Sequence, residues 1–464
     1  MSSLLARLNT DFEDATATVD ALRTGRVTAT QVLECARRAA ESGRSINAFV
    51  TEDWEGAEVV AAAIDARRAA GESLGVLAGV PFSVKDVIAV AGLPATAASK
   101  AFADSIAAVT SPVVQRFLDA DAVLIGKTNC PEFAFGTTCT SPLLGATANP
   151  RFPGVSPGGS SGGEAAALAA GISAFGIGTD FGGSLRWPAQ CVGITALRPT
   201  AGLLAAHGQL PGAGGDMGHD LNAAPTGIQG WLQTIGPLAR SVRDLTMLFE
   251  VMTDAPSTEP PVGDRLRVAW SDGTALGPVR REFITLMGEL AEALSAAGHQ
   301  VSSVPDVFAD CLSAYNHLRA VEPMVDHVAA ITGVADLISA ANRRTIDDSL
   351  RASPADVDAA ACAARSAQTA ARTIFADHDI VLLPVAGGPA CDPDGRLDID
   401  GNTLEGWELM GQCRAVSLVG APVVSLPVGL SANGLPLSVQ VIAAPGHDRQ
   451  ALAFAAVLEN LTGE

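Results

Sequence analysis

Short apolar runs alternate with helix-like segments along most of the chain after residue 76, and this alternation limits the possible folds more than any other feature. The runs have the length and composition of strands, and the segments between them carry apolar residues at helical spacing. The predicted strands are 80–85, 122–126, 174–180, 380–384, 422–427 and 437–442, and the predicted helices are 164–170, 241–253, 281–297 and 449–460. This order predicts an α/β fold with a buried mixed sheet.

Two regions without strand signals set the expected organisation of the chain. Residues 1–70 are expected to form an N-terminal helical segment packed on the core, with Thr28 and Gln31 at capping-box spacing. The rest, 71–464, is the main domain, in which the alanine-rich stretch 310–377 is predicted to form a helical side layer. No linker-like or strongly charged run divides the chain, so a single domain is expected overall.

Charge and composition exclude several classes of function. The chain has 464 residues, 48% of them hydrophobic, and a formal net charge of −20, which argues against binding nucleic acid or anionic membranes through a basic surface. It has no apolar run long enough for a membrane span. Its eight cysteines form no CxxC pair. We therefore expect a soluble, cytoplasmic protein whose thiols are reduced.

Two Gly/Ser-rich clusters are the strongest candidates for a functional site. In the first, 156–164, four glycines surround Ser160 and its neighbour directly before an alanine-rich helix. Its apolar flanks argue against the alternative of a flexible lead-in. In the second, 178–188, Ser184 follows two glycines, and successive amides there can line an oxyanion hole. Those amides belong to Phe181, Gly182, Gly183 and Ser184.

Three familiar motifs offer other interpretations of these clusters. A P-loop fails because Glu164 stands where its lysine should be, and a dinucleotide fingerprint fails because Phe181 replaces its third glycine. The residues around Ser160 do satisfy G-x-S-x-G, the nucleophile elbow of α/β-hydrolases, with His447 as a partner. An elbow needs a preceding strand, whereas 149–157 contains three prolines. The elbow stays open as an alternative.

The positions of the histidines argue against a histidine base and favour a lysine. None of the seven histidines lies in either cluster, and no metal-ligand spacing such as HExxH is present, so neither a metal nor a cofactor is expected. A hydrolase built from these clusters needs another base, and Lys85 ends a predicted apolar strand. The alternative for Lys85 is a structural one, in which it reaches the surface or pairs with Asp86.

Taken together, the three segments resemble the amidase signature family. The resemblance rests on Lys85 in Val-Lys-Asp, Ser160 in Gly-Gly-Ser-Ser-Gly-Gly and Ser184 in Gly-Thr-Asp-Phe-Gly-Gly-Ser-Leu-Arg. The two serines are 184 − 160 = 24 positions apart, as in that family. The resemblance extends over roughly residues 28–460, because further sequence blocks follow in the family's order. These blocks are 127–133, 197–202, 236–244, 420–427 and 434–440.

The resemblance implies a single α/β/α domain around a mixed sheet and a Ser–cis-Ser–Lys triad. In that triad Ser184 is the nucleophile, Ser160 the bridging serine and Lys85 the base. A lysine removed from water loses its proton near neutral pH and can then accept one relayed through a serine. The resemblance also implies that a set of neighbouring groups fixes the loops, namely Ser161, Thr179, Asp180 and Arg186.

The implied function is a serine hydrolase that cleaves C–N bonds of linear carboxamides through an acyl-enzyme. Carbamates (urethanes) and esters are related substrates, and no metal, cofactor, nucleic acid or membrane is involved. A homodimer is expected. Two alternatives share the fold, namely a non-catalytic scaffold and an amidotransferase-type subunit. A third alternative is an α/β-hydrolase in which Ser160 is the nucleophile.

The chain departs from compact family members between 203 and 235, where a longer glycine-rich stretch carries apolar side chains. Such a stretch has the backbone freedom of a lid, and its apolar residues are expected to favour neutral, bulky or aryl groups. The alternative is a surface loop that never contacts substrate. The side chains expected in the substrate pocket are Leu210, Met217, Ile228 and Trp231.

Overall fold

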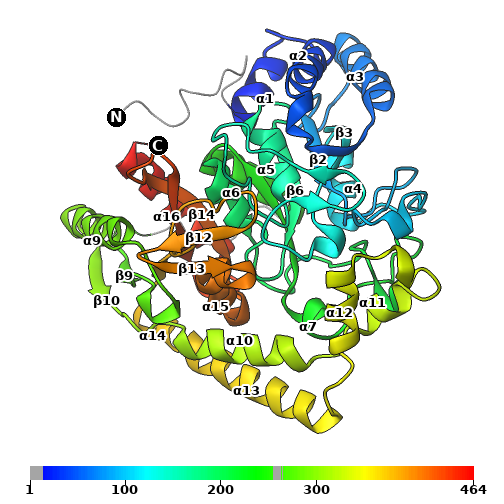
Figure 1. The fold of residues 1–464 in the computed structure, drawn as a ribbon. Helices are drawn as coiled ribbons and strands as arrows, with labels where there is room; N and C mark the ends of the chain where they lie inside the picture. The colour runs from blue at the N-terminus through cyan, green and yellow to red at the C-terminus, as the bar shows by residue number, and fades with distance from the viewer. Residues whose placement is uncertain (1–13, 254–262, 264, 464) are drawn as a thin grey trace.

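The computed structural model describes residues 14–253, 263 and 265–463 and consists of a mixed central sheet surrounded by helices (Figure 1). The strands are β1 (Phe49–Glu52), β2 (Pro81–Lys85), β3 (Val123–Thr128), β4 (Thr140–Ser141), β5 (Gly145–Ala146), β6 (Phe175–Asp180), β7 (Thr195–Arg198), β8 (Thr234–Ala239), β9 (Arg267–Trp270), β10 (Gln300–Ser303), β11 (Ile380–Pro384), β12 (Arg396–Ile399), β13 (Asn402–Glu405), β14 (Val423–Leu430) and β15 (Pro436–Ile442). The helices are α1 (Ala15–Arg23), α2 (Ala29–Ser42), α3 (Trp54–Ala69), α4 (Pro112–Asp119), α5 (Gly162–Ala169), α6 (Arg186–Val192), α7 (Gly227–Leu232), α8 (Val242–Thr253), α9 (Arg281–Ala296), α10 (Ala309–Val321), α11 (Val325–Ala330), α12 (Ala340–Asp348), α13 (Pro354–Arg372), α14 (Ile374–Asp377), α15 (Gly411–Val419) and α16 (Asp448–Thr462).

The central sheet has eleven strands in the order β1-β3-β2-β6-β8-β7-β14-β15-β11-β9-β10. Strand β2 lies between β3 and β6 and is parallel to both, whereas β6 and β8 are antiparallel. The sheet is therefore mixed, and the predicted single α/β domain is confirmed. Because β2 and β6 are parallel neighbours, their carboxyl ends meet at the same edge, and this edge holds the candidate site.

All six predicted strands are present, as β2, β3, β6, β11, β14 and β15, and the four predicted helices are α5, α8, α9 and α16. The sheet also contains β7, β8, β9 and β10, which the apolar-run pattern missed. Strand β8 contains Gly236 and Pro237, both disfavoured in strands, and β7 ends on the buried Arg198. Tertiary packing overrides local preference in these strands.

The N-terminal region is helical with one exception. Thr28 and Gln31 form the predicted capping box, since the Thr28 hydroxyl accepts the Gln31 amide at 3.1 Å and the Gln31 side chain accepts the Thr28 amide at 3.0 Å. The exception is β1, which lies within the segment predicted to be all helical and pairs with β3 at the edge of the sheet. The prediction for residues 1–13 lies outside the described residues.

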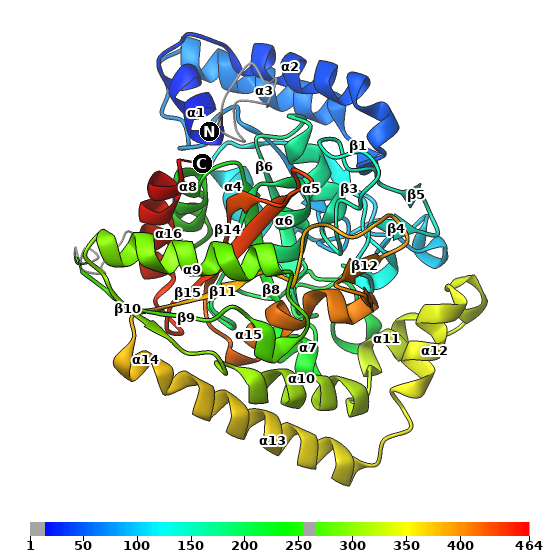
Figure 2. The same ribbon diagram turned by 60° about the vertical axis from the view of Figure 1, so that its left-hand side comes forward.

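The region 310–377 forms helices α10 to α14 and, as predicted, contains no strand among the residues that the structure describes. Helices α10 and α13 pack together and run along one side of the molecule (Figure 2). Helix α10 also contacts α15, so this region is joined to the C-terminal half of the chain. Helix α10 and the segment before α15 both reach the candidate site.

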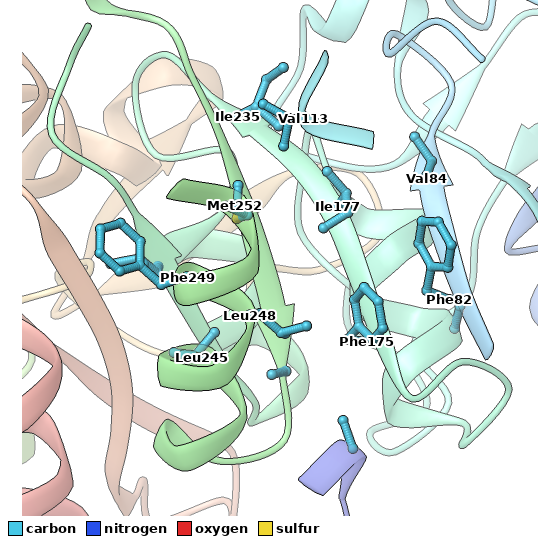
Figure 3. Packing of buried hydrophobic residues seen from close by; sticks show 14 of the residues in the cluster. Phe82, Val84, Val113, Phe175, Ile177, Ile235, Leu245, Leu248, Phe249 and Met252 are labelled. Carbon is cyan, nitrogen blue, oxygen red and sulfur yellow. The ribbon is translucent and has the colours of Figure 1, made fainter. Parts of the chain in front are cut away.

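The main core lies between the sheet and helices packed on it. The rings of Phe82 in β2 and Phe175 in β6 stack at 5.0 Å, and Phe117 in α4 lies 5.2 Å from Phe175. Helix α8 contributes Leu245, Leu248 and Phe249 to the same cluster (Figure 3). The three phenylalanine rings of β2, β6 and α4 are fully buried. This packing fixes β2 beside β6, the two strands that carry candidate site residues.

All eight cysteines are free, and six of them are buried. Within the described ranges we find no helix whose length and apolar character would suffice to span a bilayer.

Replacing Phe175 by Ala should lower the free energy of unfolding by about 3–5 kcal/mol, because it leaves a cavity between two aromatic neighbours. Denaturant unfolding followed by circular dichroism measures the change. Val59→Ala is the control, since Val59 is 71% exposed on α3 and its truncation should change stability by no more than about 0.5 kcal/mol. Equal effects of the two substitutions would contradict this assignment of the core.

Candidate active site

Lys85 lies at the carboxyl end of β2 and is fully buried. Its Nζ donates to Ser160 Oγ at 2.6 Å and to Thr179 Oγ1 at 2.9 Å. Thr179 comes from the neighbouring strand β6, and Ser160 from the loop before α5. The alternative predicted for Lys85, a surface position or a pair with Asp86, is wrong: Asp86 pairs instead with Lys127, whose Nζ is 3.5 Å from Asp86 Oδ1.

Burial lowers the pKa of Lys85 from 10.5 to about 8. The cause is the loss of hydration of the ammonium group, which disfavours the charged form. Nearby acidic groups, including Asp180 and Glu164, oppose this effect only in part. A substantial fraction of Lys85 is therefore neutral slightly above neutral pH, and a neutral amine can accept a proton.

The loop that carries Ser160 is tied closely to the end of β6. The Gly159–Ser160 peptide is cis, the isomer that the family resemblance implies at this serine. Ser161 donates its amide to the Ser184 carbonyl at 3.2 Å and its hydroxyl to the Thr179 carbonyl at 3.3 Å. The contact requires Gly178, because a Cβ at this position would lie 2.7 Å from Ser161 Oγ. The two predicted clusters are thus one site.

Asp180 organises the turn that leads to Ser184. Its buried carboxylate accepts the amides of Gly183 at 2.9 Å and Leu185 at 3.1 Å and receives two hydrogen bonds from Arg186, at 2.8 and 3.0 Å. Burial alone would raise the pKa of Asp180, but Arg186, Arg198 and the amide hydrogen bonds outweigh it and lower this pKa to about 2. The carboxylate therefore stays ionised and holds the turn.

These hydrogen bonds change one detail of the expected oxyanion hole. The Gly183 amide, predicted to point at substrate, donates to Asp180 instead. The remaining candidates are the amides of Phe181, Gly182 and Ser184. All three residues line a pocket in front of Ser184, so their backbone is within reach of a bound molecule.

This pocket encloses about 860 Å³, including the part open to solvent, and contains both serines of the predicted triad. Its aromatic lining residues are Phe133, Phe135, Phe181, Tyr315 and Trp407. Its charged or titratable lining residues are Arg319, Glu322, Asp326, His327 and Arg414. Most of these residues belong to α10, to the segment that follows it, or to the segment around α15, so the helical region forms one wall of the site.

Only one of the four predicted pocket residues lines this cavity. Ile228 does, whereas Leu210 and Met217 are buried in the main core and Trp231 packs in a second core cluster. The Leu210 amide donates to the Val87 carbonyl at 2.8 Å, which holds this part of the 203–235 stretch against the end of β2. The part of the stretch around α7 does line the pocket, through Thr226, Ile228, Gln229 and Gln233, but three of these side chains are polar, so the apolar character of the stretch does not describe the pocket.

The pocket residues that α10 contributes were not predicted from the sequence. Tyr315, Arg319 and Glu322 recur at the spacing i, i+4, i+7, which places them on one face of a helix. That spacing is a signal for a polar helical face within an alanine-rich region. Nothing in the sequence indicates that this face is turned toward Ser184, because the contact depends on how α10 packs against α15.

The elbow interpretation of Ser160 is wrong. The segment 149–157 forms no strand, so the strand that an elbow requires is missing. His447 is exposed at the start of α16 and does not line the pocket that contains Ser160. No group of three or more potential metal-ligating side chains occurs within the described part of the chain.

Comparison with known proteins identifies the class. The amidase family matches the chain over residues 30–452. The chain is 32% identical to the indoleacetamide hydrolase of Bradyrhizobium diazoefficiens, over 97% of this chain and 86% of the relative. It is 31% identical to a glutamyl-tRNA(Gln) amidotransferase subunit from Deinococcus radiodurans, over 97% of each.

The fold agrees with these sequence similarities. A solved structure described as the crystal structure of an amidase superposes with a TM-score of 0.83 at 28% identity, and the match covers 96% of this chain and 99% of the other. The chain therefore belongs to the amidase family, which confirms the resemblance seen in its sequence.

Replacing Asp180 by Asn should destabilise the protein by about 3–5 kcal/mol, because it leaves Arg186 and Arg198 buried without a compensating charge. Chemical denaturation measures this loss. Asp336→Asn is the matched control, since Asp336 is 97% exposed in its pair with Arg343 and should contribute less than about 1 kcal/mol. A similarly small effect at Asp180 would show that this carboxylate does not hold the turn.

Proposed function

We propose that the protein is a serine hydrolase that cleaves the C–N bond of linear carboxamides through an acyl-enzyme on Ser184. The observation that carries the proposal is the 2.6 Å contact between Lys85 Nζ and Ser160 Oγ, made by a buried lysine whose pKa is lowered to about 8. Ser184 lines the same pocket as Ser160. A base, a bridging hydroxyl and a nucleophile are thus available at one site without histidine.

In the proposed mechanism the neutral amine of Lys85 accepts the proton of Ser160, while Ser160 accepts the proton of Ser184. Ser184 Oγ attacks the amide carbonyl, and the backbone amides of Phe181, Gly182 and Ser184 are the candidates that stabilise the negative charge on the carbonyl oxygen. The proton returns along the same hydroxyls to the leaving nitrogen as the C–N bond breaks. Water then attacks the acyl-enzyme by the same route and releases the carboxylic acid and Ser184.

The pocket supports part of the expected substrate class. Aromatic side chains of Phe133, Phe135, Phe181 and Trp407 can hold an aryl or otherwise bulky group. The relative that acts on indoleacetamide is consistent with an aryl-bearing amide. Carbamates and esters form acyl-enzymes by the same chemistry and remain candidates. The expectation of a neutral substrate depended on the 203–235 stretch, most of which lies away from the pocket.

An amidotransferase-type subunit is the second candidate, favoured by the similarity to one component of a glutamyl-tRNA(Gln) amidotransferase over nearly the full length of both chains. Such a subunit works with partner chains, so amide hydrolysis by the purified chain alone favours the first candidate. A non-catalytic scaffold is disfavoured because all three triad positions are occupied. The cytoplasmic location and the homodimer stay predictions.

A fluorophosphonate probe should form a covalent adduct on Ser184, because this serine is proposed to be the nucleophile. Peptide mapping by mass spectrometry locates the adduct. Ser184→Ala should lower kcat by about 10⁴-fold or more while the circular dichroism spectrum and the melting temperature stay close to those of the wild type. An adduct on Ser160 would refute the assignment of the nucleophile.

The rate should depend on pH through Lys85. Because only the neutral amine can act as base, kcat/KM should rise about tenfold per pH unit below 8 and level off above it. Lys85→Ala should remove this limb together with most of the rate, and Lys85→Arg should not restore it, since arginine stays protonated. Lys100→Ala is the control, because Lys100 is exposed. A Lys85 variant with the wild-type profile would exclude lysine as the base.

A further inference from the structure

Arg319 lies in the wall of the active-site pocket, where the Glu322 carboxyl acts on it only from beyond salt-bridge distance. Arg319 comes from α10 and lines the same cavity as Ser184. Its Nη2 donates to the thioether sulfur of Met324 at 3.4 Å, a weak acceptor, and its guanidinium carbon lies 5.8 Å from the centre of the Phe135 ring. Among the residues that the structure describes, no carboxylate oxygen lies within 4 Å of its guanidinium nitrogens.

Three other arginines of this protein have oxygen acceptors. Arg186 pairs with a carboxylate, Arg151 donates to the carbonyls of residues 192 and 193, and Arg198 donates to the carbonyls of residues 232 and 421. Each of these guanidinium groups finds oxygen acceptors, as a buried charge requires. Arg319 is partly buried, and burial lowers its pKa, yet its neighbours are a sulfur and a ring. Its other guanidinium nitrogens are accessible to a molecule in the pocket.

The other charges that face the pocket do not supply such an acceptor. The Asp326 carboxylate accepts the amides of Gly214 at 3.0 Å and Thr226 at 2.8 Å. Glu322 accepts the Ile228 amide through Oε1, and burial raises its pKa to about 7, so it is only partly ionised near neutral pH. Asp326 is therefore engaged with the backbone, whereas Glu322 Oε2 is buried without a hydrogen-bond partner and the Glu322 carboxyl interacts with Arg319 from beyond salt-bridge distance.

The remaining titratable neighbours add no negative charge. Burial lowers the pKa of His327 to about 3, so this ring is neutral. A second guanidinium, that of Arg414, lies 5.0 Å from the centre of the Tyr315 ring and donates to the Trp407 carbonyl at 3.5 Å. Tyr315 is itself neutral, because burial raises its pKa above 10. Two guanidinium groups, those of Arg319 and Arg414, thus line this wall together with the Asp326 carboxylate and the partly ionised Glu322.

We infer that Arg319 binds a carboxylate of the substrate, at a distance from the amide that is cleaved, and thereby selects anionic amides. The inference rests on the proposed role of Ser184. A guanidinium matches the two oxygens of a carboxylate with parallel hydrogen bonds, and a partly desolvated site strengthens them. The neighbouring Phe135 ring offers an apolar surface to the carbon skeleton that joins this carboxylate to the amide.

Two pairs of substrates test the inference and show which side of the amide carries the charge. In the first pair the acyl group is charged, as in the monoanilide of glutaric acid, and its methyl ester is the neutral match. In the second pair the leaving group is charged, as in 4-(butanoylamino)benzoate, again with its methyl ester. We expect the wild type to prefer the acid over the ester by about 10–100-fold in kcat/KM in one pair, mainly through KM.

Arg319→Met should abolish this preference, because it should lower kcat/KM for the acid far more than for the neutral ester. Arg319→Lys should retain part of the preference, because lysine keeps the charge but cannot form the bidentate pair of hydrogen bonds. Arg365→Met, at an exposed position on α13, is the matched control and should leave both substrates unaffected. Thermal unfolding of each variant shows whether it is folded.

Equal turnover of acid and ester by the wild type in both pairs would overturn the inference, and so would equal losses for acid and ester in Arg319→Met. Calorimetry tests the inference independently of the proposed function, because it measures binding of the substrate without turnover. Ser184→Ala should bind the preferred acid at least about tenfold more tightly than its ester, and adding Arg319→Met should remove the difference. If the acid binds no more tightly, the inference fails even if Ser184 is the nucleophile.

Discussion

The desolvation of Lys85 is the constraint on which the active site depends. The protein has two fully buried lysines near each other in the sheet, and they have different partners. Lys127 lies 3.5 Å from the Asp86 carboxylate, whereas Lys85 donates to the hydroxyls of Ser160 and Thr179. Burial lowers the pKa of both lysines, and that of Lys85, whose hydrogen-bond partners are uncharged hydroxyls, falls to about 8. The contact with Ser160 joins the proposed base to the proposed bridging serine.

The surrounding fold keeps Lys85 out of water and out of direct contact with a carboxylate. Parallel pairing of β2 with β6 brings Lys85 beside Thr179, and the Asp180 carboxylate is turned into the loop, where it holds two amides and Arg186. Arg186 in turn donates to the Cys413 carbonyl and to the Gln440 side chain, both from the C-terminal part of the chain. One buried ion pair thus connects the turn at Ser184 to distant strands and helices.

The segments that the structure brings together at the candidate site could be recognised from the sequence because their signals are local. Glycines and serines at 156–164 and 178–188, and a lysine ending an apolar strand, are visible without a structure, and so is the α/β alternation. The pocket walls were not predicted, because they form from segments far apart in the chain. Ile228 is the one expected pocket residue that lines the cavity, while Arg319 reaches it only through the packing of α10 on α15.

The state of Lys85 can be measured directly, since the chain contains only three lysines, at positions 85, 100 and 127. Labelling of lysine with ¹³C at the ε carbon gives three resonances, and Lys85→Arg assigns the one of interest. We predict that this resonance titrates with a midpoint near 8. A Lys85 that stays protonated to pH 10 would contradict the account, because it could not accept the proton of Ser160 at working pH.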